Sequence, residues 1–351
     1  MKYHVYVGSY TGGNGGNGIS LLQLDTREKT LTFVSSWQEA GSNPSFLAVA
    51  RDYVFAVSEQ EDCGYITSLR RNPATGELSK INSIKTEGSA MCHLCLWPDG
   101  KYLSASNYMS GSLLVCRVGA DGRLGDVCEF LQHEGTGFDS VGRQEGPHVH
   151  STGISPDGKY LYAADLGLDQ LFCYEIGENG SLILAEEDRQ IHTPAGTGPR
   201  HFTFSADGRF LYLMTEMGNR LFVYENEDGC GKYGLIQHMG TLPEGYSGFS
   251  QGADIHLSRD GRFLYLSNRG ANTIGVFAVS GETGLVRPVG QQDCMGDFPR
   301  NFCITPDDGF MLIANQKSGS VALCGRSPEN GLMGGKLAEV LIPEAVFVCA
   351  V

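Results

Sequence analysis

The sequence has no apolar run close to the roughly 18 residues that a membrane-spanning helix needs. It also lacks the sustained three-to-four-residue apolar period of an amphipathic helix, and its apolar residues occur instead in short or alternating runs. Glycine is abundant, with 48 residues, as is typical of a chain with many turns. These features predict an all-β protein that does not enter a membrane.

Positive charge is scarce, because 26 Lys and Arg stand against 40 Asp and Glu and give a formal net charge of −14. No basic run is present, which argues against nucleic acid as a partner. The 11 cysteines are an odd number spread singly through apolar segments such as LLVCRV, and this favours a reduced cytosol over a disulfide framework. The N-terminal MKYHVYVGSYTGG turns polar after seven residues, unlike a signal peptide. We therefore expect a cytoplasmic protein.

Motifs for metals and cofactors are missing as well. The Cys-x-x-Cys pair of Cys92 and Cys95 has no second pair to complete a zinc site. The glycine-rich GGNGGNG at 12–18 precedes the predicted strand ISLLQLD, whereas a phosphate-binding loop precedes a helix. We interpret it as a flexible connection and expect neither a cofactor nor a metal ion.

One sequence pattern recurs along the chain. GPHVHSTGISPDGKYLY at 146–162 returns as GPRHFTFSADGRFLY at 198–212. The Asp of each turn anchors a repeat with spacings of 47, 58, 50, 53 and 47 residues, and these anchors are Asp52, Asp99, Asp157, Asp207, Asp260 and Asp307. Each unit reads as a short strand, a turn in which Asp-Gly supplies positive φ angles, an apolar strand and a third strand. At Asp52-Tyr53 the glycine is lost, so a different or looser turn is expected there. Units of about 50 residues with three or four strands are typical of β-propeller blades.

The two ends of the chain supply one more blade. The N-terminal YHVYVGSYT, GISLLQLD and LTFVSSWQ are three strands without a first, and the C-terminal AVFVCAV is a lone strand. Together they close a seventh blade, which removes the exposed edges of the ring. The prediction is a seven-bladed β-propeller that forms a single domain over 1–351.

Polar residues occupy matching positions of the repeat, where a position that only filled a core would stay apolar. Seven residues before each anchor stand Ser45, Cys92, His150, Arg200, Ala253 and Arg300, followed by Phe46, His93, Ser151, His201, Asp254 and Asn301. The second strands end at Glu59, Asn107, Asp165, Glu216, Asn268 and Asn315, and Arg269 follows the fifth of these. We expect them to face a central channel or its mouth. His148 is an alternative to His150, because a strand period of two puts both on one side.

The motifs GPHVHSTGISPDGKYLYAADLG, GPRHFTFSADGRFLY, LSNRGANTI and FPRNF resemble those of the seven-bladed bacterial 6-phosphogluconolactonases, which are similar also to propeller carboxymuconate-cyclising enzymes. The resemblance spans the whole chain. It implies hydrolysis of 6-phospho-glucono-1,5-lactone in the pentose phosphate route, or action on another lactone. The four positions implied as catalytic are His150 (or His148), Arg200, Glu216 and Arg269.

The chemistry of lactone opening assigns a role to each group. His150 is the expected general base, with Glu216 either orienting it or acting as the base itself. Arg200 and Arg269 would stabilise the oxyanion and the carboxylate formed, while Arg300 with His201 would hold the phosphate. Asn268 is a further candidate for substrate binding.

Two other classes of function stay open. A calcium-dependent lactonase could use the carboxylates and amides at the ends of the second strands. A non-catalytic propeller that binds a sugar, a peptide or a protein would show exposed aromatic patches on its mouth loops. The insert LQHEGTGFDSVGRQEG at 131–146, with one Phe and four charged residues, favours a solvated lid instead. The partner expected is a small sugar lactone, and the chain is expected to be a monomer or a weak homo-oligomer.

Overall fold

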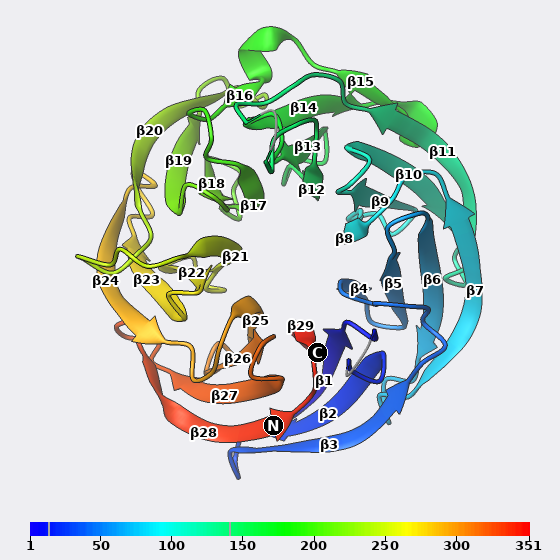
Figure 1. Cartoon of the computed structure of the whole chain (residues 1–351), viewed down its shortest axis with the longest axis vertical. Coiled ribbons are helices and arrows are strands. Elements are labelled where there is room, and N and C mark those ends of the chain that lie inside the picture. The colour runs from blue at the N-terminus through cyan, green and yellow to red at the C-terminus, as the bar shows by residue number, and fades with distance from the viewer. Residues whose placement is uncertain (13–14, 140–141) are drawn as a thin grey trace.

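A computed structural model describes residues 1–12, 15–139 and 142–351, and in this part of the chain twenty-nine strands form seven antiparallel sheets around a central axis (Figure 1). The fold is the expected seven-bladed β-propeller. Two positions of the predicted glycine-rich connection (13–14) and two of the predicted lid (140–141) lie outside the described residues. The inner end of every blade points at the axis, so residues on the first strands can meet there.

The strands run outward from the axis in each blade. Blade one consists of β4 (Leu47–Val49), β5 (Tyr53–Glu59), β6 (Gly64–Arg71) and β7 (Leu78–Thr86), and blade two of β8 (Met91–Leu96), β9 (Tyr102–Asn107), β10 (Ser112–Val118) and β11 (Leu124–Gln132). Blade three consists of β12 (Val149–Ile154), β13 (Tyr160–Asp165), β14 (Gln170–Ile176) and β15 (Leu182–Leu184), and β16 (Ile191–His192) also pairs with β14. Two short 3-10 helices flank β15, namely η1 (Glu178–Gly180) and η2 (Glu187–Arg189).

Blades four to six repeat the same order. They consist of β17 (Pro199–Phe204), β18 (Phe210–Thr215), β19 (Arg220–Asn226) and β20 (Tyr233–Gly240); β21 (Gln251–Leu257), β22 (Phe263–Arg269), β23 (Thr273–Val279) and β24 (Val286–Asp293); and β25 (Pro299–Ile304), β26 (Phe310–Asn315), β27 (Ser320–Arg326) and β28 (Met333–Leu341).

The seventh blade joins both ends of the chain, as the sequence predicts. C-terminal β29 (Ala345–Ala350) is its inner strand and pairs with β1 (Lys2–Ser9), which is followed by β2 (Ile19–Asp25) and β3 (Thr30–Trp37). Backbone hydrogen bonds between His4 and Val351 extend this pairing to the last residue. Hydrogen bonds between the two distant ends of the chain thus close the ring, and they leave β29 as the inner edge strand and β3 as the outer edge strand of this blade.

The repeated turns differ from the expected tight Asp-Gly hairpin in one respect. Only the glycine has a positive φ, while the Asp side chain accepts hydrogen bonds, as Asp157 does from Ser155 Oγ at 2.6 Å and from the Lys159 N–H at 3.2 Å. The turn at Asp52 is indeed different, but it is shorter rather than looser, because the Ala50 N–H donates to the Tyr53 carbonyl at 2.8 Å.

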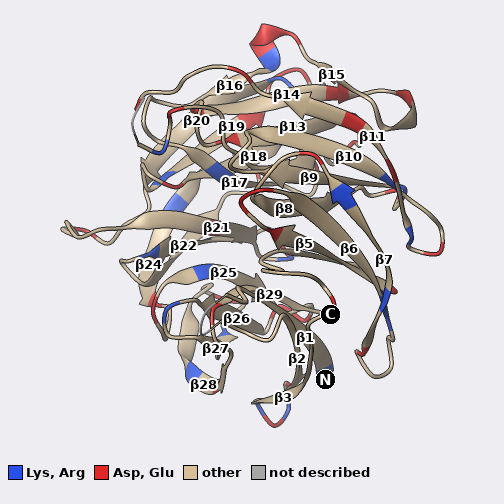
Figure 2. Ribbon diagram, turned by 45° about the vertical axis from the view of Figure 1, so that its right-hand side comes forward, with Lys and Arg blue, Asp and Glu red and all other residues tan. Residues whose placement is uncertain are grey.

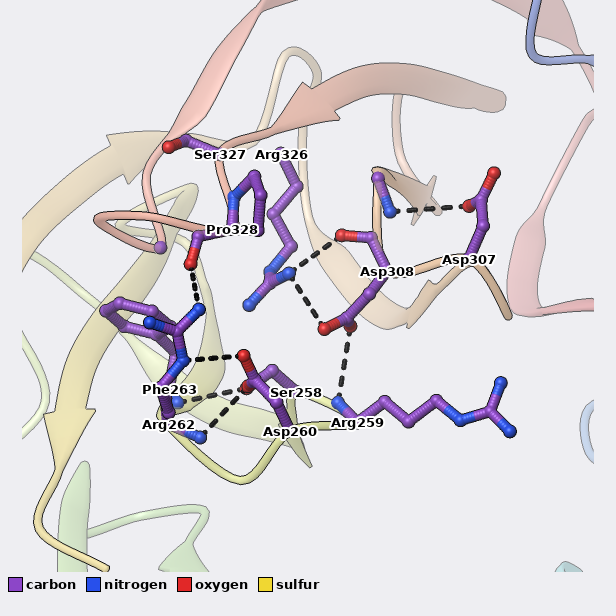
Figure 3. A network of polar contacts seen from close by, with 12 residues as sticks. Ser258, Arg259, Asp260, Arg262, Phe263, Asp307, Asp308, Arg326, Ser327 and Pro328 are labelled. Carbon is purple, nitrogen blue, oxygen red and sulfur yellow. Dashed lines mark hydrogen bonds and ion pairs between the residues drawn. The ribbon is translucent and has the colours of Figure 1, made fainter.

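In blade six an aspartate replaces the glycine of the turn, and its side chain makes contacts that a glycine cannot make. Asp308 adopts the positive φ of 61° and pairs its carboxylate with Arg326 of the same blade at 3.1 Å. The same carboxylate accepts the Arg259 N–H of blade five at 3.2 Å, and Figure 3 shows how it lies between the two blades. A side chain in place of the glycine therefore ties neighbouring blades together.

The core lies between the blades rather than inside them. One cluster, for example, packs Tyr162 and Ala164 of blade three against Leu211 and Leu213 of blade four. Buried tyrosines of the second strands add a hydrogen bond from the hydroxyl to a glycine carbonyl of the next blade, in the pairs Tyr6–Gly76, Tyr162–Gly231, Tyr212–Gly284 and Tyr265–Gly331, at 2.6–3.1 Å. Apolar packing and these buried bonds hold the ring together.

A β-bulge recurs near the start of the first strand in blades two to six. In the pairing of β12 with β13 the register skips from Val149 to Ser151, so that His150 is the extra residue. The same shift leaves Arg200 unpaired in β17 and Arg300 unpaired in β25. A bulge turns a side chain out of the alternation of its strand. The bulges thus direct two consecutive side chains of one strand toward the axis.

Charged residues are distributed over all blades, and Figure 2 shows Lys and Arg interspersed with Asp and Glu along the ribbon. In the described ranges no helix is long and apolar enough to span a membrane.

The bond between Tyr162 and Gly231 provides a test of the contacts between blades. Tyr162→Phe leaves the buried Gly231 carbonyl without its 2.7 Å donor and should lower the free energy of unfolding by about 1–3 kcal/mol. Tyr224→Phe is the control, because the Tyr224 hydroxyl makes no hydrogen bond to the described residues. Denaturant titration of both variants measures the difference, and equal losses would contradict this account.

Candidate functional site

A cavity of about 350 Å³ opens at the mouth where the second strands end. Its wall contains side chains from all seven blades and from the loop before blade three, namely Tyr10, Glu59, Cys92, Tyr108, Arg143, His150, Glu216, Gln251, Arg269, Phe298, Arg300 and Gln316. Three guanidinium groups against two carboxylates make this wall net positive. A chain with a net charge of −14 therefore carries a local site suited to an anion.

One carboxylate organises the arginines. Glu216, directly after β18, accepts Arg200 Nε at 2.8 Å and Arg269 Nη2 at 2.8 Å on Oε2. Its Oε1 accepts Arg143 Nη2 at 2.9 Å, and the residue is 2 % exposed. Although burial opposes ionisation, the three guanidinium groups lower the pKa of Glu216 well below its ordinary value. An ionised carboxylate whose two oxygens are both occupied by guanidinium groups is a structural anchor.

Arg269 contacts the cavity and is incompletely satisfied. Its Nη2 also donates to the Gly252 carbonyl at 2.9 Å, but Nε is buried without a partner among the described residues. Burial, together with the nearby Arg200 and Arg300, lowers the pKa of Arg269 to about 9, so the group stays a cation at neutral pH. Because its guanidinium is a cation on the cavity wall, Arg269 is suited to stabilise a developing negative charge there.

The structure places Arg200 below the cavity wall rather than on it. The side chain is 2 % exposed, binds Glu216 and the Ala253 carbonyl, and borders a small void under the cavity floor. The predicted direct contact with the oxyanion therefore needs correction. Arg200 holds Glu216 in place and adds positive charge below the floor of the cavity.

Arg300 forms no ion pair within the described part of the chain. Its guanidinium lies over the ring of Tyr10, 5.3 Å from the centroid, and lines the cavity. Although burial opposes it, Tyr10 and Glu59 raise the pKa of Arg300. Glu59 itself accepts Ser45 Oγ and the Tyr10 hydroxyl, the latter at 3.1 Å. The fork of Arg300 remains available for an anionic ligand.

His150 is brought to the cavity wall by its bulge. Burial and the nearby Arg200 lower the pKa of His150 well below its ordinary value, so the ring is neutral at pH 7. Nδ1 is buried without a hydrogen-bond partner among the described residues, while Nε2 is the nitrogen left in contact with the cavity. A neutral imidazole with one nitrogen toward a cavity can accept a proton there.

Two predicted residues are not brought to the cavity. Because of the bulge, His148 and His150 do not share a side: His148 stacks on Tyr108 with ring centroids 4.5 Å apart, and its nitrogens bind the Tyr108 carbonyl and Glu145. Asn268 is fully buried, where it binds Thr241 and Thr273. Both of these side chains therefore maintain the loops around the mouth.

His201 also differs from its expected place. It lies one layer below the cavity, where Nδ1 binds Asp254 Oδ1 at 2.8 Å, and it borders a second pocket of about 210 Å³ at the opposite mouth. Burial first, and then Arg200, lowers the pKa of His201 to about 4. The predicted pairing of His201 with Arg300 around a phosphate is therefore incorrect for the main cavity, because the two residues share only the small void beneath it.

The site contains residues that the repeat does not reveal. Arg143 reaches Glu216 from the insert, and both its Nε and Nη2 donate to the Tyr108 hydroxyl, at 2.9 and 2.6 Å. The insert has no counterpart in other blades, so no aligned position pointed to it. The only signal was its length, since it makes one repeat the longest, at 58 residues.

The carboxylates proposed for calcium are engaged inside the protein, whereas the amide oxygens of Asn107 and Asn315 are buried without a partner among the described residues. Asp165, for example, accepts the N–H groups of His148, Gly167 and Leu168, and its other oxygen binds His133 at 2.6 Å. Among the described residues no three His, Cys, Asp or Glu converge as a metal-binding group. The donor set therefore does not fit the calcium alternative.

Exposed aromatic side chains do occur on loops at the mouth. Phe138 of the insert is 73 % exposed and Phe249, before β21, is 65 % exposed. The insert is thus less purely polar at its surface than its composition indicates. Single exposed aromatics are common on protein surfaces, and they do not by themselves favour the binding alternative.

Comparison with known proteins places the chain among lactonases. Residues 4–350 match the model of the family described as a seven-bladed β-propeller lactonase. A 6-phosphogluconolactonase of Bacillus subtilis is 32% identical over 99% of this chain and 98% of its own, and one of Formosa agariphila is 30% identical over 96% of each. The solved structure of a periplasmic gluconolactonase of Pseudomonas aeruginosa has a TM-score of 0.92 and 34% identity, covering 100% of this chain and 99% of that one.

Because burial lowers the pKa values of several histidines near the channel, we expect the folded protein to become less stable in acid. His201 stays neutral in the folded protein down to about pH 4, whereas the unfolded chain binds its proton near pH 6.5. Stability should therefore fall as the pH drops between these values, by roughly 3 kcal/mol at pH 4 from this group. Burial also lowers the pKa values of His93 and His150, so these two residues likewise make the folded protein less stable as the pH falls. His256 has the opposite effect on stability, because Asp254 raises its pKa although burial opposes this.

The variant His201→Asn isolates this contribution. We expect its free energy of unfolding to decline less than that of the wild type between pH 6.5 and pH 4, because no imidazole remains to be protonated on unfolding. Denaturant titrations at several pH values measure both slopes. Identical slopes would show that His201 does not titrate as described.

Proposed function

Because residues 4–350 match its model, the chain belongs to the seven-bladed lactonase family and is a lactone hydrolase, and we propose that its substrate is 6-phospho-glucono-1,5-lactone, opened to 6-phosphogluconate in the pentose phosphate route. The observation that carries this proposal is the cavity in which a neutral His150, the cationic Arg269 and Arg300, which has no ion pair among the described residues, share one wall. Such a wall offers a base, an oxyanion donor and an anion anchor together.

The lactone end of the substrate fits beside His150 and Arg269. His150 Nε2 takes a proton from the attacking water while the oxygen of that water bonds to the lactone carbonyl carbon. Arg269 donates to the carbonyl oxygen as it becomes negative. When the ring C–O bond breaks, the imidazolium returns the proton to the leaving ring oxygen, and the new carboxylic acid releases its own proton as a carboxylate. Atoms and charges balance without a cofactor.

The phosphate end fits beside Arg300. The positions of Gln251, Gln316 and Tyr10 around the same cavity add neutral hydrogen-bonding groups near this guanidinium. In this proposal Arg300 carries the specificity for the phosphate, because the other guanidinium groups of the wall already serve Glu216. A phosphorylated substrate is held inside cells, which agrees with the expected cytoplasmic location.

A lactone without phosphate is the second candidate. It is favoured by the likeness to the gluconolactonase of Pseudomonas aeruginosa and by the presence of only one unpaired arginine among the described wall residues. The two candidates use the same base and the same oxyanion donor, so they differ only in what Arg300 contacts.

The role of His150 predicts a loss of turnover. His150→Asn should lower kcat on the phosphorylated lactone by roughly 10²- to 10⁴-fold, because the general base is removed. The control His192→Asn changes an exposed histidine that binds Glu187 on the outside of the ring. A pH-stat assay with freshly prepared lactone measures both, and turnover by His150→Asn at the wild-type rate would remove His150 from the reaction.

The role of Arg300 predicts a change of specificity. Arg300→Gln should lower kcat/KM roughly 10- to 100-fold for the phosphorylated lactone, the size of a lost charge-assisted hydrogen bond, and leave glucono-1,5-lactone nearly unchanged. Arg220→Gln, on the exposed start of β19, is the control for loss of one positive charge. An equal loss on both substrates would assign Arg300 to the lactone end instead.

A further inference from the structure

Two ring nitrogens near the channel axis are buried without partners in the part of the chain that the structure describes. They are Nδ1 of His150 and Nε2 of His201. The two rings are close, with centroids 5.2 Å apart and planes inclined by 68°. Burying a polar nitrogen without a hydrogen bond is costly, so a pair of such atoms in neighbouring rings calls for an explanation.

Both rings border the same small void beneath the cavity floor. Its volume is about 10 Å³, and Ser45, Cys92, Arg200 and Arg300 contribute to its wall. This is close to the space that a single water molecule requires, and the wall offers several polar groups beside the apolar Phe46 and Val346. A single water can therefore bridge the two nitrogens.

The proton on His201 is fixed by its partner. Asp254 Oδ1 binds His201 Nδ1 at 2.8 Å, and Oδ2 accepts His256 Nε2 at 2.8 Å together with the Phe302 N–H at 3.2 Å. A carboxylate only accepts, so Nδ1 of the neutral His201 carries the hydrogen and Nε2 is a lone-pair acceptor. Although burial opposes it, His256 and His201 lower the pKa of Asp254, which keeps the carboxylate ionised.

We propose that His201, held by Asp254, is a positioning residue for His150: His150 Nδ1–H donates to one water in the void, and this water donates to His201 Nε2. The chain of hydrogen bonds places the hydrogen of the neutral His150 on Nδ1 and leaves Nε2 as the proton acceptor toward the cavity. This inference rests on the proposed function for its catalytic meaning and on the void and the two nitrogens for its geometry.

Arg269 and Asp254 favour this orientation over the reverse one. A neutral imidazole has a positive N–H end and a negative lone-pair end. Arg269 lines the cavity that Nε2 faces and does not border the void, whereas the Asp254 carboxylate lies behind His201 on the other side; Arg300 borders both spaces, and Arg200 borders the void. The lone pair toward Arg269 and the N–H toward the carboxylate are the favourable pairing. During turnover the same carboxylate would stabilise the imidazolium that forms at His150.

His201 thereby takes the role of orienting His150, which the sequence analysis assigns to Glu216. The Glu216 carboxylate is fully engaged by Arg143, Arg200 and Arg269, and no hydrogen bond joins it to His150 among the described residues. The residue that orients the base is thus contributed by the layer below the cavity and not by the cavity wall.

The test uses a substitution that keeps one hydrogen bond and removes the other. In His201→Asn the amide Nδ2–H can still donate to Asp254, while the acceptor at the position of Nε2 is lost. We expect kcat on the lactone to fall roughly 10- to 100-fold with KM unchanged, as for the loss of a group that orients another. His93→Asn is the matched control, because His93 occupies the same layer with its ring 5.4 Å from His201 but does not border the void.

A second measurement does not depend on any substrate. Long-range proton–nitrogen NMR spectra of protein labelled with ¹⁵N-histidine report which nitrogen of His150 carries the hydrogen, with the signals of His150 assigned by their loss in His150→Asn. We expect the Nδ1–H form in the wild type and in His93→Asn, and a mixture of forms in His201→Asn.

The outcomes separate this inference from the proposed function. An Nε2–H form in the wild type, as when the water donates to both rings, would overturn the positioning role, and so would an unchanged tautomer in His201→Asn. If no lactone is hydrolysed but the tautomer behaves as described, the proposed substrate fails and the hydrogen-bonded chain stands.

Discussion

The site depends on the ion pairs of one buried carboxylate. Glu216 neutralises part of the charge of Arg143, Arg200 and Arg269, three guanidinium groups that would otherwise repel one another at the mouth of the ring. Removing one partner from such a buried group leaves uncompensated charge, which costs several kcal/mol. Because Glu216 is engaged in this way, we propose His150 as the base, and Arg300 is the wall arginine that has no ion pair among the described residues.

The architecture is predictable from sequence because it repeats. The turn aspartates, the apolar second strands and the two incomplete ends predict seven blades and the manner of closure, and the second strand expected to end at Glu59 is β5 (Tyr53–Glu59). Some positions facing the axis are predictable for the same reason, but polarity in a constant frame does not by itself place a residue at the channel, because Asn107, Asp165, Asn268 and Asn315 are fully buried. His150, Glu216, Arg269 and Arg300 do line one cavity.

What the sequence could not predict depends on local backbone shifts and on parts outside the repeat. The period of two that groups His148 with His150 fails, because a bulge changes the direction of the second side chain. The layer to which Arg200 and His201 belong is set by the same bulge, so their depth relative to the cavity could not be derived from spacing. Arg143 comes from the insert, where no alignment between blades exists to reveal it.

The central claim is that one cavity binds the whole substrate, with the reacting carbon at His150 and Arg269 and the distant anion at Arg300. A crystal structure of the protein with 6-phosphogluconate tests it most directly. The account predicts the carboxylate of this product beside Arg269 and His150 Nε2, and the phosphate on the guanidinium of Arg300. Product bound at the opposite mouth near His256, or with its phosphate away from Arg300, would contradict it.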